Sequence, residues 1–201
     1  MKPIIGIVTR PVYSEENYNM YGVYEAIATA VKGAGGIPVG IVLNTDNEIL
    51  NKIDGLIFQG GDDFTAYEKE LIKTAYEKNI KTLGICLGMQ LMGITFNGYL
   101  KDIANHKYKD RNYVHKIQIK KDSLLYDIFK KEKIMVNSRH KSALVDTSLN
   151  VTAISEDNVI EAIESKDKDF FLGVQWHPES MIKYDANSIE LFKYFVDRCR
   201  E

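Results

Sequence analysis

The chain has 201 residues, of which 45% are hydrophobic and 27% charged, and its formal net charge is −2. This length suits one domain with a substantial core, and the interspersed acids and bases argue against a nucleic-acid or anionic membrane surface. No apolar run is long enough for a signal-peptide core or a membrane span. The only two cysteines, Cys86 and Cys199, could form one disulfide bridge, but a thiol that acts as a nucleophile would be lost in it, which favours a reducing compartment,. We therefore expect a cytoplasmic protein that binds neither nucleic acid nor membrane.

The first half of the chain alternates apolar, β-prone runs with stretches of helical periodicity. The stretch 22–34 has apolar residues at helical spacing and ends at a glycine pair, which is a helix stop signal,. Near-continuous apolar strands that alternate with helices predict a parallel sheet covered on both faces. The expected strands span 4–9, 37–43, 55–58 and 81–85, and the expected helices span 22–34, 45–52, 67–78 and 88–96.

The second half changes character, because short β-prone segments follow one another with few helical intervals. Asp157-Asn158 is a plausible hairpin turn between two of them,. We expect antiparallel hairpins added to the parallel core, and a final helix over 186–200 with an apolar stripe. The expected strands span 114–120, 133–136, 151–155, 159–164 and 170–174.

Cys86 lies between the expected strand 81–85 and the expected helix 88–96, and Gly84 and Gly88 flank it. Small residues at these positions permit the sharp strand-to-helix turn of a nucleophile elbow, which projects the side chain into a cleft. The adjacent helix N-terminus favours a thiolate. A lone cysteine after an apolar run is otherwise typical of an inert core residue. The flanking glycines favour the nucleophile.

The segment 173–179 contains His177, Pro178 and Glu179. In an extended backbone, side chains two residues apart face the same side, and proline stiffens the chain between them. A carboxylate on one imidazole nitrogen fixes the tautomer, so that the other nitrogen can accept a thiol proton. His-Pro-Glu alone is also typical of a turn with a solvated acid. With Cys86, the two side chains predict a Cys-His-Glu triad.

These motifs resemble the class I glutamine amidotransferase superfamily, and within it the γ-glutamyl-γ-aminobutyrate hydrolase-like group, peptidase C26. The resemblance rests on 83–90, the Gly60-Gly61 turn and 174–179, and it extends over 2–7, 24–39, 54–62, 136–140 and 159–164. It implies one α/β domain over residues 1–201. The implied core is a flavodoxin-like parallel sheet flanked by helices, with the active site at the carboxyl ends of the strands.

The resemblance also implies a reaction. Cys86 attacks the γ-carbonyl carbon of a glutamine-like amide, and His177, held by Glu179, takes up a proton and later protonates the leaving amine. A γ-glutamyl thioester forms, and water then releases glutamate. The implied oxyanion hole consists of backbone N–H groups of Leu87 and of Gly60 or Gly61.

The implied contacts to the glutamyl moiety are Gln90, Ser138, Arg139 and His140. By residue type alone, Gln90 is equally typical of a solvent-facing helix amide, and 138–140 of a surface turn after a strand. We expect no cofactor. We also expect no metal, because no Cys, His or carboxylate partners stand at metal-ligand spacing, and the basic stretch flanked by His106 and His115 is interpreted as a solvated surface loop,. The resemblance implies a structural role for His115.

Two features depart from the hydrolase pattern. Leu87 stands where the hydrolases often have arginine, and the loop 62–68 is short, so that Asp62 and Asp63 are interpreted as helix N-caps rather than substrate contacts,. Both features favour a different member of the superfamily, a glutaminase subunit that feeds ammonia to a synthetase.

We therefore consider three functions. The first is a cysteine-dependent hydrolase that releases glutamate from a γ-glutamylated amine or a similar small metabolite. The alternative is a glutaminase subunit that acts on glutamine and supplies ammonia to a separate synthetase partner. The third, a non-catalytic binding module, is disfavoured by the intact Cys86, His177 and Glu179. A homodimer and a complex with a synthetase are the two assemblies that these functions suggest.

Overall fold

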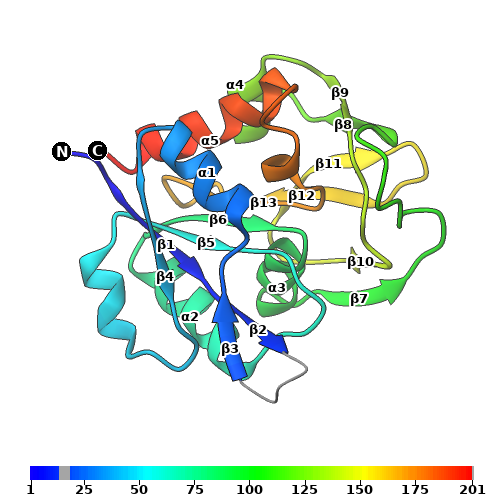
Figure 1. The fold of residues 1–201 in the computed structure, drawn as a ribbon. Helices are drawn as coiled ribbons and strands as arrows, with labels where there is room; N and C mark the ends of the chain where they lie inside the picture. Colours follow the sequence, from blue (N-terminus) through cyan, green and yellow to red (C-terminus); the bar gives the residue numbers. More distant parts are fainter. Residues whose placement is uncertain (14–18, 201) are drawn as a thin grey trace.

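A computed structural model describes residues 1–13 and 19–200 of the chain. Within these residues, nine strands form one sheet in the order β4-β1-β5-β6-β13-β12-β11-β8-β9 (Figure 1). In chain order these strands are β1 (Ile4–Val8), β4 (Ile37–Ile41), β5 (Gly55–Phe58), β6 (Lys81–Ile85), β8 (His115–Ile119), β9 (Lys133–Val136), β11 (Asn150–Ser155), β12 (Ile160–Glu164) and β13 (Phe171–Val174).

Two small two-stranded sheets lie outside this main sheet. One pairs β2 (Arg10–Tyr13) with β3 (Asn19–Gly22), and the other pairs β7 (Tyr99–Asp102) with β10 (Ser142–Val145). The α-helices are α1 (Glu25–Gly33), α2 (Ala66–Glu77), α3 (Leu87–Thr95), α4 (Leu124–Phe129) and α5 (Ala186–Arg198), and two 3-10 helices are η1 (Asn47–Lys52) and η2 (Pro178–Ser180).

The main sheet has a parallel and an antiparallel part. Strands β4, β1, β5, β6 and β13 run parallel to one another. Strand β12 pairs with β13 in the antiparallel direction, and β11, β8 and β9 continue the sheet as antiparallel strands. The predicted fold class, a flavodoxin-like α/β core with antiparallel hairpins added in the second half, is confirmed.

Helices cover both faces of the parallel part (Figure 1). Ile27 of α1 and Phe192 of α5 belong to one buried apolar cluster, and Leu71 of α2 and Leu91 of α3 belong to the other. Strands between two helix layers have no solvent-facing side, which is why β5 and β13 are buried along their whole length,. This explains their continuous apolar sequences.

Element type was predicted better than element ends. Strands β5, β6 and β9 have the predicted bounds, but α1 starts at Glu25 rather than at 22 because Tyr24 has extended backbone, and the expected helix over 45–52 is the 3-10 helix η1. The hairpin β2–β3, the pair β7–β10 and the six-residue α4 were not predicted. Strand β7 is largely exposed and lacks a buried alternation, so periodicity gives no signal there,.

Neither Cys86 nor Cys199 forms a disulfide, and both are buried. Across residues 1–13 and 19–200, no helix combines the length and the apolar character that a membrane span requires.

Candidate active site

Three neighbouring parallel strands, β5, β6 and β13, deliver the principal predicted residues at their carboxyl ends. Gly60 lies just beyond β5, Cys86 directly follows β6, and His177 lies three residues beyond Val174, the last residue of β13. Because β6 lies between β5 and β13 in the sheet, the three segments meet at one edge. This edge is where open α/β sheets bind their ligands.

Cys86 adopts a backbone conformation that few non-glycine residues tolerate, with φ 51° and ψ −104°,. The turn requires close packing on both sides. A Cβ at Gly84 would lie 2.4 Å from the Met92 sulfur, and one at Gly88 would lie 2.1 Å from the carbonyl oxygen of Phe58. The two glycines are therefore needed for the strand-to-helix elbow, as the sequence predicted.

Glu179 holds His177, with 2.7 Å between His177 Nδ1 and Glu179 Oε1. The contact was predicted, but the backbone route to it was not. His177 precedes the 3-10 helix η2, in which Pro178 takes the first position, where its fixed φ and missing N–H are tolerated. The pair therefore meets across a helical turn and not along an extended strand.

Asn137 fixes the backbone of His177, a role that the sequence analysis did not assign. Its Oδ1 accepts a 2.8 Å hydrogen bond from the His177 N–H, and its Nδ2 donates at 2.8 Å to the His177 carbonyl oxygen. Asn137 is fully buried and directly follows β9. The available signal in the sequence was an asparagine directly after a predicted strand. Its partner, His177, is 40 residues away, so local spacing could not identify it.

The charge on His177 is set by opposing effects. Burial disfavours the imidazolium, but the Glu179 carboxylate and a hydrogen bond with Cys86 outweigh it and raise the pKa of His177 to about 10. An imidazolium beside Cys86 stabilises the thiolate form of the sulfur. The Cys86 sulfur also accepts a 3.6 Å hydrogen bond from Gln175 Nε2. This environment suits a nucleophilic thiol. By contrast, burial raises the pKa of Cys199 to about 12.

Gly60, Gly61 and Leu87, the residues expected to form the oxyanion hole, lie close to Cys86 or to the cavity that it lines. A Cβ at Gly60 would come 2.9 Å from His177 Cε1 and 3.7 Å from Cys86 Cβ. Leu87 is the first residue of α3, so its backbone N–H has no acceptor within the helix. The predicted oxyanion-hole residues are thus beside Cys86, and the absence of a side chain at position 60 is a steric requirement.

Buried polar side chains hold the Gly60 loop, and these were missed. Arg10 donates to the carbonyl oxygens of Gln59, at 2.8 Å, and Gly60, at 3.2 Å, and it forms a buried ion pair with Glu68. Gln59 donates to the carbonyl oxygen of Val8 at 2.8 Å. Arg10 lies two residues beyond β1, so its place at a parallel strand end was the available signal.

The helix after this loop begins differently from the prediction. Thr65 is the N-cap of α2, and it forms a capping box with Glu68,. The expectation that Asp62 and Asp63 cap this helix is therefore wrong. The spacing Thr65-x-x-Glu68 was the signal for the correct cap. Asp62 instead lines a cavity beside Cys86.

This cavity has a volume of about 100 Å³, and its walls include Cys86, Leu87, Gln90, Arg139 and His140. Gln90 is 5% exposed, so it is not a solvent-facing amide. Its Nε2 donates to the carbonyl oxygen of Ser142 at 2.8 Å and to Gln175 Oε1 at 3.1 Å.

Ser138 does not join the residues at this cavity. It is fully buried, and its hydroxyl donates to the carbonyl oxygen of His106 at 2.6 Å. Two of the three residues in the predicted 138–140 contact segment, Arg139 and His140, therefore line the cavity, and Ser138 does not.

The expectation that His106 and His115 belong to a solvated surface loop is wrong. His106 is 3% exposed, and the His115 side chain is 14% exposed. Both approach the fully buried Glu161. Their partner comes from strand β12, far along the chain, so local spacing did not reveal it.

Comparison with known families agrees with this architecture. The peptidase C26 family profile matches residues 3–67 and 64–179. Over 163 residues the chain is 29% identical to the gamma-glutamyl-CDP-amidate hydrolase of Campylobacter jejuni, covering 74% of this chain and 72% of that protein. It is also 29% identical to a subunit of the glutamine-hydrolyzing GMP synthase of Haloquadratum walsbyi, with 82% and 87% covered.

The fold is also similar to that of a solved glutaminase domain. The glutaminase domain of a Trypanosoma brucei CTPS with bound acivicin superposes with a TM-score of 0.70 at 18% identity, over 97% of this chain and 94% of that domain. The predicted superfamily is confirmed, and the chain belongs to the peptidase C26 family of glutamine amidotransferase-like proteins.

Proposed function

We propose that this chain is a cysteine-dependent hydrolase of γ-glutamyl amide bonds, which releases glutamate from a γ-glutamylated amine or a similar small metabolite. The observation that carries the proposal is the meeting of the Cys86 elbow, the His177–Glu179 pair and the Gly60 loop at the ends of three adjacent parallel strands. Membership of the peptidase C26 family supports amide hydrolysis.

In the acylation half-reaction, the Cys86 thiolate attacks the γ-carbonyl carbon and forms a C–S bond. The C–N bond then breaks as the His177 imidazolium donates its proton to the leaving amine. In the second half-reaction, neutral His177 takes a proton from water, and the resulting hydroxide attacks the thioester. The C–S bond breaks, which releases glutamate and restores the thiolate and the imidazolium. Glu179 stabilises the imidazolium in both directions.

Negative charge on the carbonyl oxygen needs hydrogen-bond donors that are already in place. We assign this role to the backbone N–H of Leu87 and to one from Gly60 or Gly61. The Arg10 contacts to the carbonyl oxygens of Gln59 and Gly60 hold this loop from behind. A preformed donor costs no reorganisation during the reaction, and loss of one typically lowers the rate by roughly 10²–10³-fold.

The cavity rim is predominantly basic and suits an anionic substrate. Lys107, Arg139 and Lys141 line it, against one acid, Asp62. We assign Arg139 to the α-carboxylate of the glutamyl group, because a guanidinium binds carboxylates in a bidentate manner. We assign the two lysines, Lys107 and Lys141, to ion pairs with a leaving group that carries phosphate or carboxylate.

The direct test is glutamate release by the purified chain. Glutamine, γ-glutamyl-aminobutyrate, γ-glutamyl-polyamines, γ-glutamyl peptides and a phosphate-bearing γ-glutamyl amide form the panel, with Cys86→Ala as the control. Efficient turnover of one γ-glutamyl compound, with glutamine poor, supports the proposal. Turnover that persists in Cys86→Ala contradicts the mechanism.

The second candidate function is a glutaminase subunit that supplies ammonia to a separate synthetase. Leu87 and the short loop before α2 favour it, as does the similarity to a subunit of a GMP synthase. Slow turnover of glutamine alone, which rises when a synthetase partner is added, would support this function. Size-exclusion chromatography with light scattering distinguishes a homodimer from a monomer that assembles only with a synthetase.

A further inference from the structure

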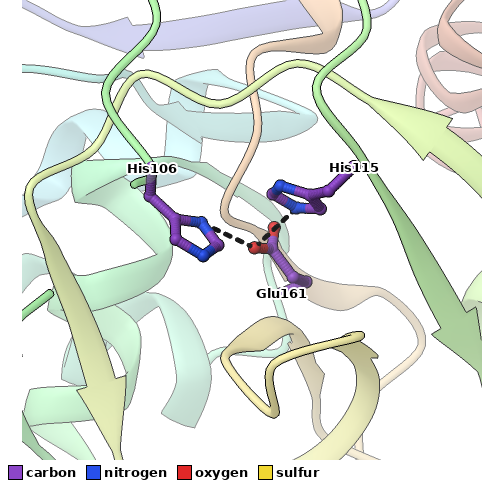
Figure 2. A group of neighbouring side chains, drawn as sticks. All are labelled: His106, His115 and Glu161. Carbon is purple, nitrogen blue, oxygen red and sulfur yellow. Dashed lines mark ion pairs between the residues drawn. The ribbon is translucent and has the colours of Figure 1, made fainter. Parts of the chain in front are cut away.

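A second group of titratable side chains is buried beside the catalytic residues. His106 lies in the connection between β7 and β8, His115 is the first residue of β8, His140 lies between β9 and β10, and Glu161 belongs to β12. Figure 2 shows that the side chains of His106 and His115 point toward the Glu161 carboxylate. The proposed hydrolysis uses none of these groups as an acid, a base or a nucleophile.

The four side chains converge with short distances between their inward atoms. His115 Nε2 lies 3.0 Å from Glu161 Oε1, while His106 Nδ1 and His140 Nε2 each lie 3.8 Å from the same oxygen. His106 Nδ1 and His140 Nε2 are 3.2 Å apart. An ion with tetrahedral bonds of about 2.0–2.1 Å holds its ligands roughly 3.3–3.4 Å from one another. These four distances, from 3.0 to 3.8 Å, bracket this value. The ligand atoms of His106, His115 and Glu161 all lie within 4.8 Å of one another.

The outward atoms of two histidines already donate hydrogen bonds. His106 Nε2 lies 2.9 Å from Asp157 Oδ2, and His140 Nδ1 lies 3.1 Å from the carbonyl oxygen of Ser142. A carboxylate and a carbonyl can only accept, so the proton of each neutral ring is on the outward nitrogen. Both inward nitrogens then present lone pairs to each other. An imidazole whose far nitrogen donates to a carboxylate or a carbonyl is the usual arrangement of a histidine metal ligand.

The Ser138 hydroxyl does not donate a hydrogen bond to either of these two nitrogens. It lies 3.3 Å from His106 Nδ1, but its single hydrogen is directed to the carbonyl oxygen of His106 at 2.6 Å. A cation between the two nitrogens would remove the repulsion between their lone pairs.

The carboxylate of Glu161 also favours a bound cation. Its side chain is fully buried, and among the residues that the structure describes none forms a hydrogen bond with either carboxylate oxygen. His115 Nε2 is close to Oε1, but the contact lacks hydrogen-bond geometry. A buried carboxylate without donors is costly unless a positive charge compensates it.

We propose that His106, His115, His140 and Glu161 form a tetrahedral binding site for Zn²⁺. Neutral imidazole and carboxylate are ligands that this ion prefers, and four protein ligands leave no open position, which is the pattern of a structural site. His106, His115 and Asp157 are among the residues that line a cavity of about 360 Å³. This proposal departs from the expectation of no metal.

The ion would connect the antiparallel part of the sheet to the active site. Glu161 accepts a hydrogen bond through its carbonyl oxygen from the backbone N–H of Gln175, whose side chain contacts Cys86. His140 is a cavity wall, and the Ser142 carbonyl oxygen that it contacts also accepts from Gln90. Zinc would therefore hold the wall that carries Arg139 in place, without taking part in the chemistry.

The test must exclude zinc bound at the Cys86–His177 pair, so it is made on full-length Cys86→Ala. The protein is stripped with a chelator, the chelator is removed, and Zn²⁺ is titrated against a chromophoric chelator while bound zinc is counted by mass spectrometry. We expect about one ion per chain. Co²⁺ in its place should give the intense visible bands of a tetrahedral site, without a sulfur charge-transfer band.

Two further variants in the same background test the ligands. Glu161→Gln should abolish stoichiometric binding. Asp157→Asn should weaken it by about 10–100-fold, and because the Asp157 side chain is 60% exposed, this variant tests the site even if Glu161→Gln does not fold. Absence of stoichiometric zinc in Cys86→Ala would overturn the proposal and leave a shared proton as the compensating charge. Binding that neither variant changes would also overturn it.

Discussion

The parallel and antiparallel parts of the main sheet position side chains in different ways. In the parallel part, backbone direction alone brings Gly60, Cys86 and His177 together, because each follows a strand that ends at the same edge. In the antiparallel part, consecutive strands end at opposite edges, so the cluster around Glu161 is assembled from two loops, one strand start and one strand interior. Strand topology therefore positions the residues around Cys86, whereas tertiary packing positions those around Glu161.

The largest expected effect tests whether the parallel part carries the chemistry. Cys86→Ala should lower the turnover of γ-glutamyl amides by about 10⁴-fold or more, because no other group supplies the nucleophile. Cys199→Ala is the matched control and should retain turnover, since that buried thiol is the C-cap residue of α5 and lies against Gly55. Initial rates with thermal melts of both variants separate lost chemistry from lost folding. Similar rates for the two variants would contradict the assignment.

Glu179→Gln should lower turnover by about 10²–10⁴-fold, because an amide cannot stabilise the His177 imidazolium. The Glu179 carboxylate raises the pKa of His177, so the variant should lose the imidazolium–thiolate pair at a lower pH than the wild type. Proton-linked stability from a raised pKa is present below about pH 6.5, the unfolded value, and is lost as pH rises through about 10.

The measurement is the rate of Cys86 alkylation against pH, together with unfolding by denaturant at pH 6 and pH 10. The stability advantage of the wild type over Glu179→Gln should be largest at pH 6 and should shrink toward pH 10. Identical alkylation profiles for the two proteins would show that Glu179 does not set the charge on His177.

Gly60→Ala tests the close approach of the loop after β5 to His177. The new Cβ would lie 2.9 Å from His177 Cε1, so the loop or the imidazole must move, and we expect turnover to fall by about 10²–10³-fold. Gly40→Ala is the matched control, since the nearest atom to its Cβ would be at an ordinary 3.4 Å. A rate in Gly60→Ala equal to that of Gly40→Ala would remove Gly60 from the oxyanion hole.

Asn137→Ala tests the connection between the two parts of the sheet, because Asn137 follows β9 of the antiparallel part and fixes the backbone of His177. Leaving the buried N–H and C=O of His177 without this partner should destabilise the fold by about 1–3 kcal/mol. We expect kcat to fall about tenfold with little change in KM. Unchanged kcat would make Asn137 purely structural, and Asn137→Asp indicates whether the acceptor alone restores the rate.

The sequence allowed prediction of features encoded over short distances. The apolar runs of β5 and β6 and the glycines around Cys86 each encode their conformation within a few residues, and the strand-end rule then places the active site. The contact between His177 and Glu179 was also predicted, although through an extended backbone rather than through the 3-10 helix that Pro178 begins.

Features that depend on distant partners could not be predicted in this way. Asn137 contacts a residue 40 positions away, and Arg10 contacts the loop that contains Gly60, 50 positions away. Glu161 receives its histidine neighbours from three separate segments. One fully local signal was also overlooked, because the spacing from Thr65 to Glu68 encodes the cap of α2 within four residues,.

The most direct test of the proposed function is the identification of the covalent intermediate. The enzyme is mixed with a γ-glutamyl amide, quenched in acid during turnover, and digested for peptide mass spectrometry. We predict a γ-glutamyl adduct on the peptide that contains Cys86, formed and lost at rates that match turnover, and no adduct with the corresponding α-glutamyl amide. Glutamate release without an adduct, or an adduct on Cys199 alone, would contradict the proposed function.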